Sequence, residues 1–220
     1  MTELAAPQFD RLVGVYRWME RLSFGNWLWR CRCAFLGEMR GAGRALVLGD
    51  GDGRFTARLL RENARVGVDA VDLSAAMLGA LTERAGNDRG RVRVQAADVR
   101  DWQPSGDAYD LVVTHFLLDC LTTDEVALLA ARVREWVAED AVWVVSEFAI
   151  PPGWFGRIVA RPVVRFLYWA FGWMTGLRVR ELPDWAGTLE RAGFERRARI
   201  LWLRGLLVSE VWGKASPWSD

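Results

Sequence analysis

The chain has 220 residues, 51% of them apolar, which is enough to bury one sizeable core. Its 29 basic and 28 acidic side chains leave a formal net charge of +1, so no long-range field favours a nucleic acid. We therefore expect one domain over residues 1–220 and no nucleic-acid partner.

The cysteines and the chain start indicate where the protein works. Cys31, Cys33 and Cys120 are too few for a disulfide framework, and the Cys-x-Cys pair has no nearby histidine to complete a zinc site. The chain opens with acidic Glu3 where a signal peptide would carry basic residues. The most apolar stretch, residues 163–177, is shorter than the roughly 20 residues needed to span a bilayer. We expect a cytoplasmic protein with reduced thiols, no metal and no transmembrane segment.

The predicted elements begin with a helical cap over residues 1–40, because Phe9, Leu12, Val13 and Tyr16 fall at helical spacing. Short apolar runs then alternate with helical patterns, which is typical of a parallel sheet covered by helices on both faces. This alternation predicts an α/β, doubly wound, mostly parallel sheet. The expected strands are residues 45–48, 65–72, 91–96, 109–114 and 141–147, and the expected helices are 54–62, 74–84 and 124–138.

The C-terminal third departs from this alternation. Residues 151–182 are predicted to form a helical insertion of one or two helices that begin near Trp154 and Pro162. Residues 183–192 read as a further helix. Two strand-like runs, 194–203 and 206–212, then meet at Gly205, which predicts a terminal hairpin.

A glycine-rich turn is the strongest local signal. Gly49, Gly51 and Gly53 directly follow an apolar strand and directly precede a helix. Glycine allows positive φ, and it lets a ligand approach the backbone where a Cβ would stand in the way. The turn alone does not identify a ligand site, since such turns also occur without a ligand.

Two aspartates strengthen this interpretation. Asp72 ends the next strand, 19 residues after Gly53, where a carboxylate can accept hydrogen bonds from a ribose diol. Asp98 follows the third strand at the same edge, where it can accept from an adenine amino group. Each aspartate could instead cap the helix that follows it, but the three elements together favour an adenosine-type cofactor at the carboxyl edge of the sheet.

Charge decides between the candidate cofactors. A dinucleotide fingerprint needs glycine at its sixth position, and here that position is Arg54. Asp50 and Asp52 inside the turn would repel a pyrophosphate, whereas they attract a sulfonium and an α-amino group. The sequence therefore favours S-adenosylmethionine over NAD.

With these motifs the chain resembles the class I S-adenosylmethionine-dependent methyltransferases, and among them the ubiquinone- and menaquinone-biosynthesis C-methyltransferase type. The likeness covers most of the chain. It implies a seven-stranded sheet in the order 3-2-1-4-5-7-6 with the last strand antiparallel, and S-adenosylhomocysteine as product. The motifs are the glycine turn, Val71-Asp72-Leu73-Ser74-x-x-Met77-Leu78, Ala97-Asp98-Val99, Tyr109-Asp110-Leu111-Val112-Val113, Glu147-Phe148 with Pro151, and the leading Phe9-Asp10…Tyr16…Met19.

Two departures from the family pattern bear on the substrate. The acidic residue usually found two places before the first glycine is Val47 here, so we expect Asp50 to take over its contact with the methionyl amino group. The Arg-Asn pair of quinone methyltransferases is replaced by Thr114-His115, which argues against a quinol acceptor.

His115 is the sole histidine in the sequence, and it follows the fourth predicted strand. It is either a general base that takes a proton from the acceptor or a residue that packs beside the cofactor. Tyr16 is assigned to the acceptor side of the catalytic site. The cofactor-binding residues that we predict are Gly49, Asp50, Gly51, Gly53, Asp72, Leu73, Met77, Asp98, Val99, Thr114 and His115.

Further aromatic residues could line an acceptor pocket, although aromatic stripes more often belong to a core. They are Tyr16, Trp154, Phe155, Tyr168 and Trp169. Three arginines spaced four apart could bind an anionic acceptor or a membrane surface, or form an ordinary solvated face; they are Arg157, Arg161 and Arg165.

The resulting hypothesis is methyl transfer from S-adenosylmethionine to a small apolar or amphiphilic acceptor, by in-line displacement. Two alternatives remain open, a nicotinamide-dependent oxidoreductase and a non-catalytic module that binds S-adenosylmethionine.

Overall fold

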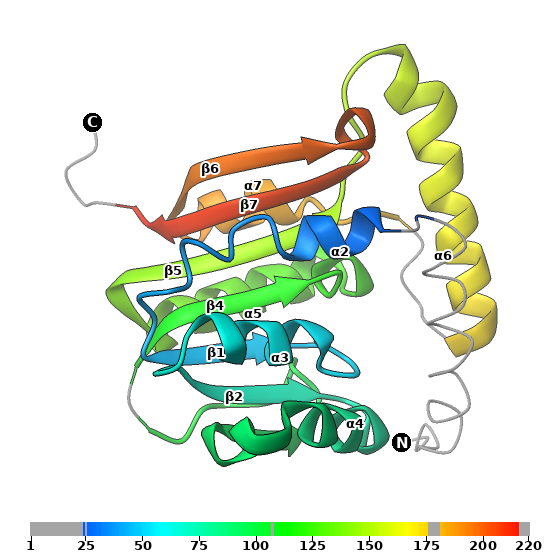
Figure 1. The fold of residues 1–220 in the computed structure, drawn as a ribbon. Coiled ribbons are helices and arrows are strands. Elements are labelled where there is room, and N and C mark those ends of the chain that lie inside the picture. Colours follow the sequence, from blue (N-terminus) through cyan, green and yellow to red (C-terminus); the bar gives the residue numbers. More distant parts are fainter. Residues whose placement is uncertain (1–23, 25, 107, 176–180, 216–220) are drawn as a thin grey trace.

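A computed structural model describes residues 24, 26–106, 108–175 and 181–215, with side chains omitted for 169–175. Seven strands form one sheet in the order β3-β2-β1-β4-β5-β7-β6 (Figure 1). Strands β1 to β5 are parallel, and β7 runs antiparallel to both β5 and β6. The predicted fold class and strand order are confirmed. The strands are β1 (Arg44–Leu48), β2 (Gly67–Asp72), β3 (Val92–Ala96), β4 (Tyr109–His115), β5 (Val137–Phe148), β6 (Phe194–Trp202) and β7 (Leu207–Lys214).

Helices cover both faces of the sheet. In Figure 1, α2 and α3 lie in front of the sheet, and α5 and α7 lie behind it. A long helical segment, which begins at Trp154 and includes a π-helical turn over Gly156–Ala160, stands beside the sheet. The helices are α2 (Trp27–Arg32), α3 (Arg54–Glu62), α4 (Ala75–Ala85), α5 (Thr123–Trp136), α6 (Arg161–Thr175) and α7 (Trp185–Arg191).

The alternation of side chains along each strand builds two cores. On β1, Leu46 and Leu48 face the core under α5 and α7, whereas Ala45 and Val47 face the core under α3 and α4. The first core is rich in tryptophan, with Trp143 and Trp212 fully buried. Both faces of the central strands are therefore apolar, as expected for a parallel sheet between two helical layers.

Local sequence signals set the helix starts. Ser74 accepts a hydrogen bond from the amide of Met77 at the start of α4. Thr122 forms a reciprocal capping box with Glu125 at the start of α5. In both cases the residue before the helix has a short side chain with an oxygen, which is the usual sequence signal for a helix start.

Some boundaries differ from the prediction. The helix predicted over 124–138 ends at Trp136, because Val137 already pairs with Tyr109 as the first residue of β5. The expected hairpin exists, with a 3₁₀ turn over Leu203–Gly205. The helical insertion begins at Trp154 as predicted. The cap residues 1–23, including Tyr16, lie outside the described residues. No helix in the described ranges is long and apolar enough to cross a membrane.

Candidate functional site

The glycine turn joins β1 to α3 at the carboxyl edge of the sheet. Gly49, Gly51 and Gly53 all have positive φ, at 69°, 62° and 74°. Such values are strained for any residue with a Cβ. The three glycines are thus explained by the backbone of the turn itself.

Close packing distinguishes two of these glycines. A Cβ on Gly53 would stand 2.6 Å from the Cα of Leu81 in α4, so this glycine lets α3 and α4 approach each other. A Cβ on Gly51 would meet nothing closer than the sulfur of Met77, at 3.8 Å. Of the two, Gly51 is therefore the one whose Cα side is open to a ligand.

Asp72 ends β2 beside this turn. Its Oδ2 accepts a hydrogen bond from the amide of Gly51 at 3.1 Å, and its Oδ1 accepts from the amide of Ser74 at 2.9 Å. Burial raises the pKa of this carboxyl group, while the hydrogen bonds from Ser74 and Gly51 oppose that rise. Leu73, the next residue, is 56% exposed. The structure thus brings the predicted carboxylate directly against the glycine turn.

The two acidic residues inside the turn have different surroundings. Asp52 forms an ion pair with Arg84 of α4 at 3.0 Å. The Oδ2 of Asp50 accepts from the backbone amide and the hydroxyl of Thr56, at 2.8 and 2.7 Å. Burial raises the pKa of Asp50 to about 6. Its other oxygen, Oδ1, is buried and meets no hydrogen-bond partner within the described part of the chain. Asp50 is therefore the turn carboxylate left to receive a cation.

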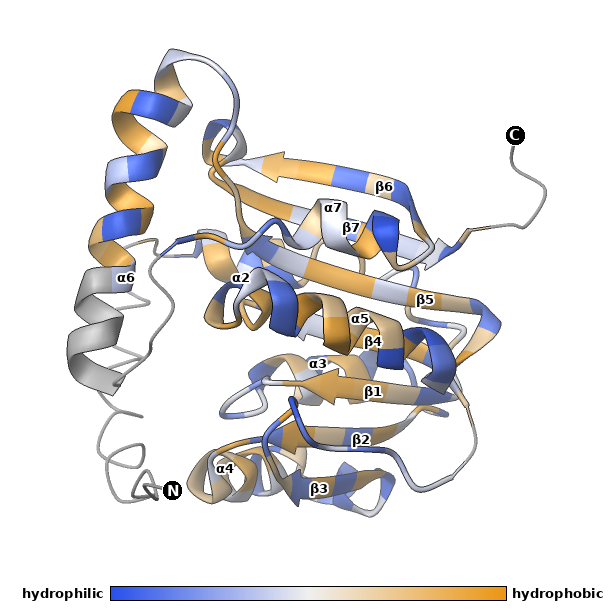
Figure 2. Cartoon of the chain, turned by 180° about the vertical axis from the view of Figure 1, so that it is seen from behind, coloured by the Kyte–Doolittle hydropathy of each residue, from blue (hydrophilic) through white to orange (hydrophobic). Residues whose placement is uncertain are grey.

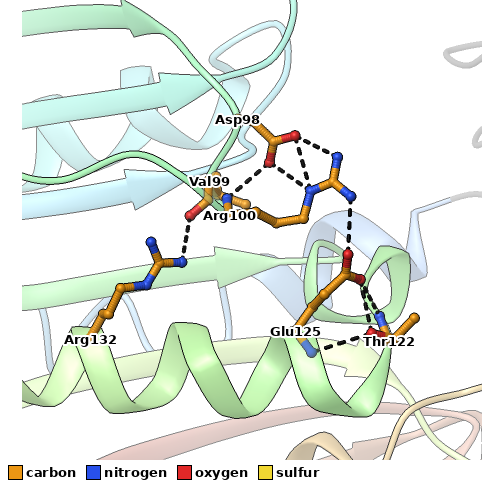
Figure 3. A network of polar contacts seen from close by, with 6 residues as sticks. All are labelled: Asp98, Val99, Arg100, Thr122, Glu125 and Arg132. Carbon is orange, nitrogen blue, oxygen red and sulfur yellow. Dashed lines mark hydrogen bonds and ion pairs between the residues drawn. The ribbon is translucent and has the colours of Figure 1, made fainter. Parts of the chain in front are cut away.

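Asp98 is held by an arginine that the sequence reasoning missed. Arg100 donates through Nε to both oxygens of Asp98, at 2.9 and 3.0 Å, and through Nη1 to Glu125 at 3.0 Å (Figure 3). Hydrogen bonding to Arg100 lowers the pKa of Asp98. Val99 is buried, and its carbonyl accepts from Arg132 at 3.1 Å. The opposite charge two residues after Asp98 was the available sequence signal.

The end of β4 places its last two residues on opposite faces of the sheet. The hydroxyl of Thr114 is buried and accepts from the indole nitrogen of Trp143 at 3.0 Å, so it belongs to the tryptophan-rich core. His115 faces α3, and its ring meets the Phe55 ring edge-on at 4.4 Å. Within the described residues neither ring nitrogen of His115 has a hydrogen-bond partner. Burial lowers its pKa well below the usual value, and the charge of Arg32 acts in the same direction.

The loop after β4 is tied to the end of β5. Phe116 adopts φ 55°, a strained conformation for a side chain of this size. The Oε1 of Glu147 accepts from the amides of Leu117 and Leu118, at 3.0 and 2.7 Å. Glu147 is fully buried, and burial, together with the nearby charge of Asp119, raises its pKa well above the usual value. The sequence marked Glu147 as part of a motif but assigned it no role.

The helical insertion contributes unevenly to this edge. The hydroxyl of Tyr168 donates to the carbonyl of Asp119 at 3.0 Å, which anchors α6 to the loop after β4. Phe155 is half-buried, whereas Trp154 is 60% exposed. The side chain of Trp169 lies outside the described set. Of the predicted pocket aromatics, the structure brings Tyr168 and Phe155 inward.

Other chemistry is limited in the described residues. Cys31, Cys33 and Cys120 are free thiols. No cluster of three or more metal-ligating side chains occurs within the ranges that the structure describes.

Comparison with known proteins agrees with this geometry. Residues 45–140 match the family model described as a methyltransferase domain. A zebrafish (Danio rerio) relative, N-terminal Xaa-Pro-Lys N-methyltransferase 1, is 32% identical over 145 residues, which make up 64% of each protein. The chain thus spans somewhat less than two thirds of the length of that relative.

Solved structures show the same methyltransferase fold. The mitomycin 7-O-methyltransferase MmcR superposes with a TM-score of 0.70 at 15% identity, over 94% of this chain and 60% of that one. The N-methyltransferase NodS from Bradyrhizobium japonicum WM9, in complex with S-adenosylhomocysteine, superposes with a TM-score of 0.63 at 13% identity, over 88% and 89%. These neighbours methylate oxygen in one case and nitrogen in the other, so the fold alone does not name the acceptor atom.

Proposed function

We propose that the protein transfers a methyl group from S-adenosylmethionine to a small apolar or amphiphilic acceptor and releases S-adenosylhomocysteine. The observation that carries this proposal is the pair of carboxyl groups at the glycine turn. Asp72 binds the amide of Gly51, and Asp50, next to Gly51 in the chain, keeps a buried oxygen without a partner in the described structure. Burying such an oxygen destabilises the folded protein unless a cation or a hydrogen-bond donor binds it.

The residues of the edge fit this cofactor. Asp72 is suited to the ribose diol, because a carboxylate can accept further hydrogen bonds while it holds two amides. Asp98 is suited to the adenine amino group, with Leu73, Met77 and Val99 as the apolar surroundings. Gly49 packs closely against Leu117, Gly51 keeps its Cα side open to the cofactor, and Asp50 receives the methionyl amino group. When bound, the cofactor supplies an electrophilic methyl group on a sulfonium.

The remaining predicted residues take positioning roles. Gly53 allows the close contact of α3 with α4, and Thr114 fixes the end of β4 through Trp143. His115 is neutral near pH 7 because burial lowers its pKa. We assign it to shaping the donor side of the site rather than to proton transfer, since methyl transfer from a sulfonium often needs only alignment. Tyr16, outside the described residues, remains proposed for the acceptor side.

The acceptor side is formed by the loop after β4 and the helical insertion. Tyr168 joins the two, and Glu147 fixes the loop amides to β5. A helix over this edge excludes water from the reacting atoms. We propose that this 220-residue chain acts as one unit in the cytoplasm, where its free thiols would stay reduced.

Calorimetric titration with S-adenosylmethionine, S-adenosylhomocysteine and NADH tests the proposal. We expect binding of the two sulfur nucleosides and none of NADH. Asp72→Asn should weaken that binding by about tenfold or more, because it removes the charge from a hydrogen-bonding carboxylate.

A matched control exists at the opposite edge of the sheet. Asp110 also accepts two backbone amides, from Gly43 at 2.7 Å and Arg44 at 3.0 Å, but it lies at the start of β4. Asp110→Asn should leave the affinity for S-adenosylmethionine unchanged. Equal affinities in the wild type and Asp72→Asn, or tight NADH binding, would overturn the proposal. Binding without methyl transfer to a panel of amines, phenols and quinols would instead favour a non-catalytic module.

A further inference from the structure

The helical insertion carries three lines of residues, each with a spacing of four. The line that packs on the protein is small or buried and consists of Gly156, Ala160, Val164 and Tyr168. The line farthest from it around the helix is exposed and apolar, and consists of Trp154, Ile158, Pro162 and Phe166. Between them runs a line of exposed arginines, Arg157, Arg161 and Arg165. We call the exposed apolar line and the arginine line together the outer face.

This arrangement reverses what a solvated surface helix shows. The position opposite the packed side of such a helix normally carries charge. Here that position carries Trp154, Ile158 and Phe166, which are 60%, 70% and 62% exposed. Figure 2 shows hydrophobic and hydrophilic bands in alternation along this helix, which stands at the side of the molecule. Large apolar side chains in such a line indicate a surface that another phase or molecule covers.

The arginines indicate what covers the outer face of the helical insertion. Between Glu147 and Glu181 the sequence contains no acidic residue, so no carboxylate of this segment neutralises the three arginines. A second copy docked through the same face would bring two arginine lines together, which like-charge repulsion opposes. A nucleic acid would pair with the arginines but leave the apolar line exposed to water. An anionic lipid surface satisfies both lines at once, because phosphate groups meet the arginines and acyl chains meet the apolar side chains.

We propose that the outer face of the helical insertion binds the surface of a membrane that contains anionic lipid. The apolar line then lies at the boundary between headgroups and acyl chains, where tryptophan is favoured. The arginines extend to the phosphates. Strands β1 and β4 point toward the side on which α6 stands (Figure 1), so the carboxyl edge lies on the membrane side of the protein. This binding does not depend on the methyltransferase activity.

Vesicle co-sedimentation of the full chain tests the proposal. The probes are phosphatidylcholine vesicles with and without phosphatidylglycerol. We expect binding to the anionic vesicles that weakens as salt rises, and little binding to the neutral ones. The triple variant Arg157→Gln, Arg161→Gln, Arg165→Gln should lower the partition coefficient by about a hundredfold, since each interfacial arginine contributes about fivefold.

The controls separate this face from net charge. The triple variant Arg65→Gln, Arg89→Gln, Arg93→Gln removes the same charge from exposed positions elsewhere and should bind as the wild type does. Ile158→Ser should weaken binding without changing its salt dependence. All of these positions are exposed, so urea unfolding should show wild-type stability for each variant. Equal losses in both triple variants, or equal binding to neutral vesicles, would overturn the proposal. So would a dimer in solution that Ile158→Ser dissociates while the vesicles bind nothing.

Discussion

The ring of His115 stands edge-on against the ring of Phe55, with the ring centroids 4.4 Å apart and the planes at 86°. This contact fills the space between the end of β4 and α3. A histidine in such a setting gains more from packing than from its nitrogens, because within the described residues neither nitrogen has a hydrogen-bond partner. The contact therefore indicates a positioning role for His115.

For this reason, His115→Ala should keep turnover within about tenfold of the wild type and lower the free energy of unfolding by roughly 1–3 kcal/mol, as loss of a packed side chain does. The measurements are steady-state methyl transfer and urea unfolding. His115→Phe should recover part of the stability, since an aromatic ring replaces another. A loss of turnover near a thousandfold with unchanged cofactor affinity would instead assign proton transfer to His115.

The affinity for S-adenosylmethionine should fall as pH drops below about 6. Burial raises the pKa of Asp50 to about 6 in the free protein, and a bound cation stabilises its ionised form. Binding below that pH must release a proton from Asp50, which costs up to about tenfold in affinity per pH unit. Calorimetry in two buffers of different ionisation enthalpy measures this proton release. Asp50→Asn should bind more weakly at pH 8 and show a flat profile; an unchanged profile would refute the role of Asp50.

The contribution of Asp50 to the free energy of unfolding should depend on pH in the opposite direction to the cofactor affinity. Burial raises the folded-state pKa of Asp50 above the ordinary aspartate value, so the contribution of this carboxyl group to stability is complete below that ordinary value. The contribution is lost as pH rises through about 6. Asp50→Asn keeps an oxygen for Thr56 and should be less sensitive to pH between 4 and 7 than the wild type, as judged from urea unfolding at each pH. A steeper dependence in the variant would contradict this expectation.

Arg100 should act on the cofactor through Asp98. It fixes both carboxylate oxygens, so Arg100→Leu leaves Asp98 free to turn and should weaken S-adenosylmethionine binding by about three- to tenfold. In a double-mutant cycle with Asp98→Asn the two losses should not add, because one acts through the other. Arg40→Leu, which breaks an exposed pair with Glu62, is the matched control. Tighter binding in Arg100→Leu would mean that Arg100 competes with the adenine group.

Two glycine substitutions should differ in cost. Gly51→Ala forces alanine into a left-handed backbone conformation, which should lower the free energy of unfolding by about 1–2 kcal/mol. Gly53→Ala adds the same strain and also drives a methyl group against the backbone of Leu81, for about 1–3 kcal/mol more. Urea unfolding of the two variants measures the difference. Equal costs would show that the contact of α3 with α4 relaxes freely.

The sequence could predict what depends on local pattern. The glycine turn, the Ser74 and Thr122 caps and the alternation of strands and helices are each encoded within a few residues, and the structure has them all. The end of α5 was misplaced because Trp136 and Val137 continue the helical spacing, while pairing with Tyr109 draws Val137 into β5. Long-range pairing outweighs local pattern at that point.

Contacts between distant segments were less accessible. The opposite faces of Thr114 and His115 follow from strand alternation, but which face meets Trp143 depends on where the helices pack. The tie from Glu147 to the amides of Leu117 and Leu118 spans about thirty residues and leaves no periodic trace in the sequence. Partners of this kind become visible only when the strand order is known.

The π-helical turn at Gly156–Ala160 affects how the protein would rest on a flat surface. On an ideal α-helix, residues four positions apart are offset by about 40° around the helix axis. A line of four such residues would therefore wind through about 120° around the helix. One wider turn takes back part of that winding. A Cβ on Gly156 would collide with the carbonyl of Pro151, so this turn depends on glycine. The outer face of the insertion can therefore contact a flat membrane along most of its length, and this extended contact sets the tilt of the whole molecule.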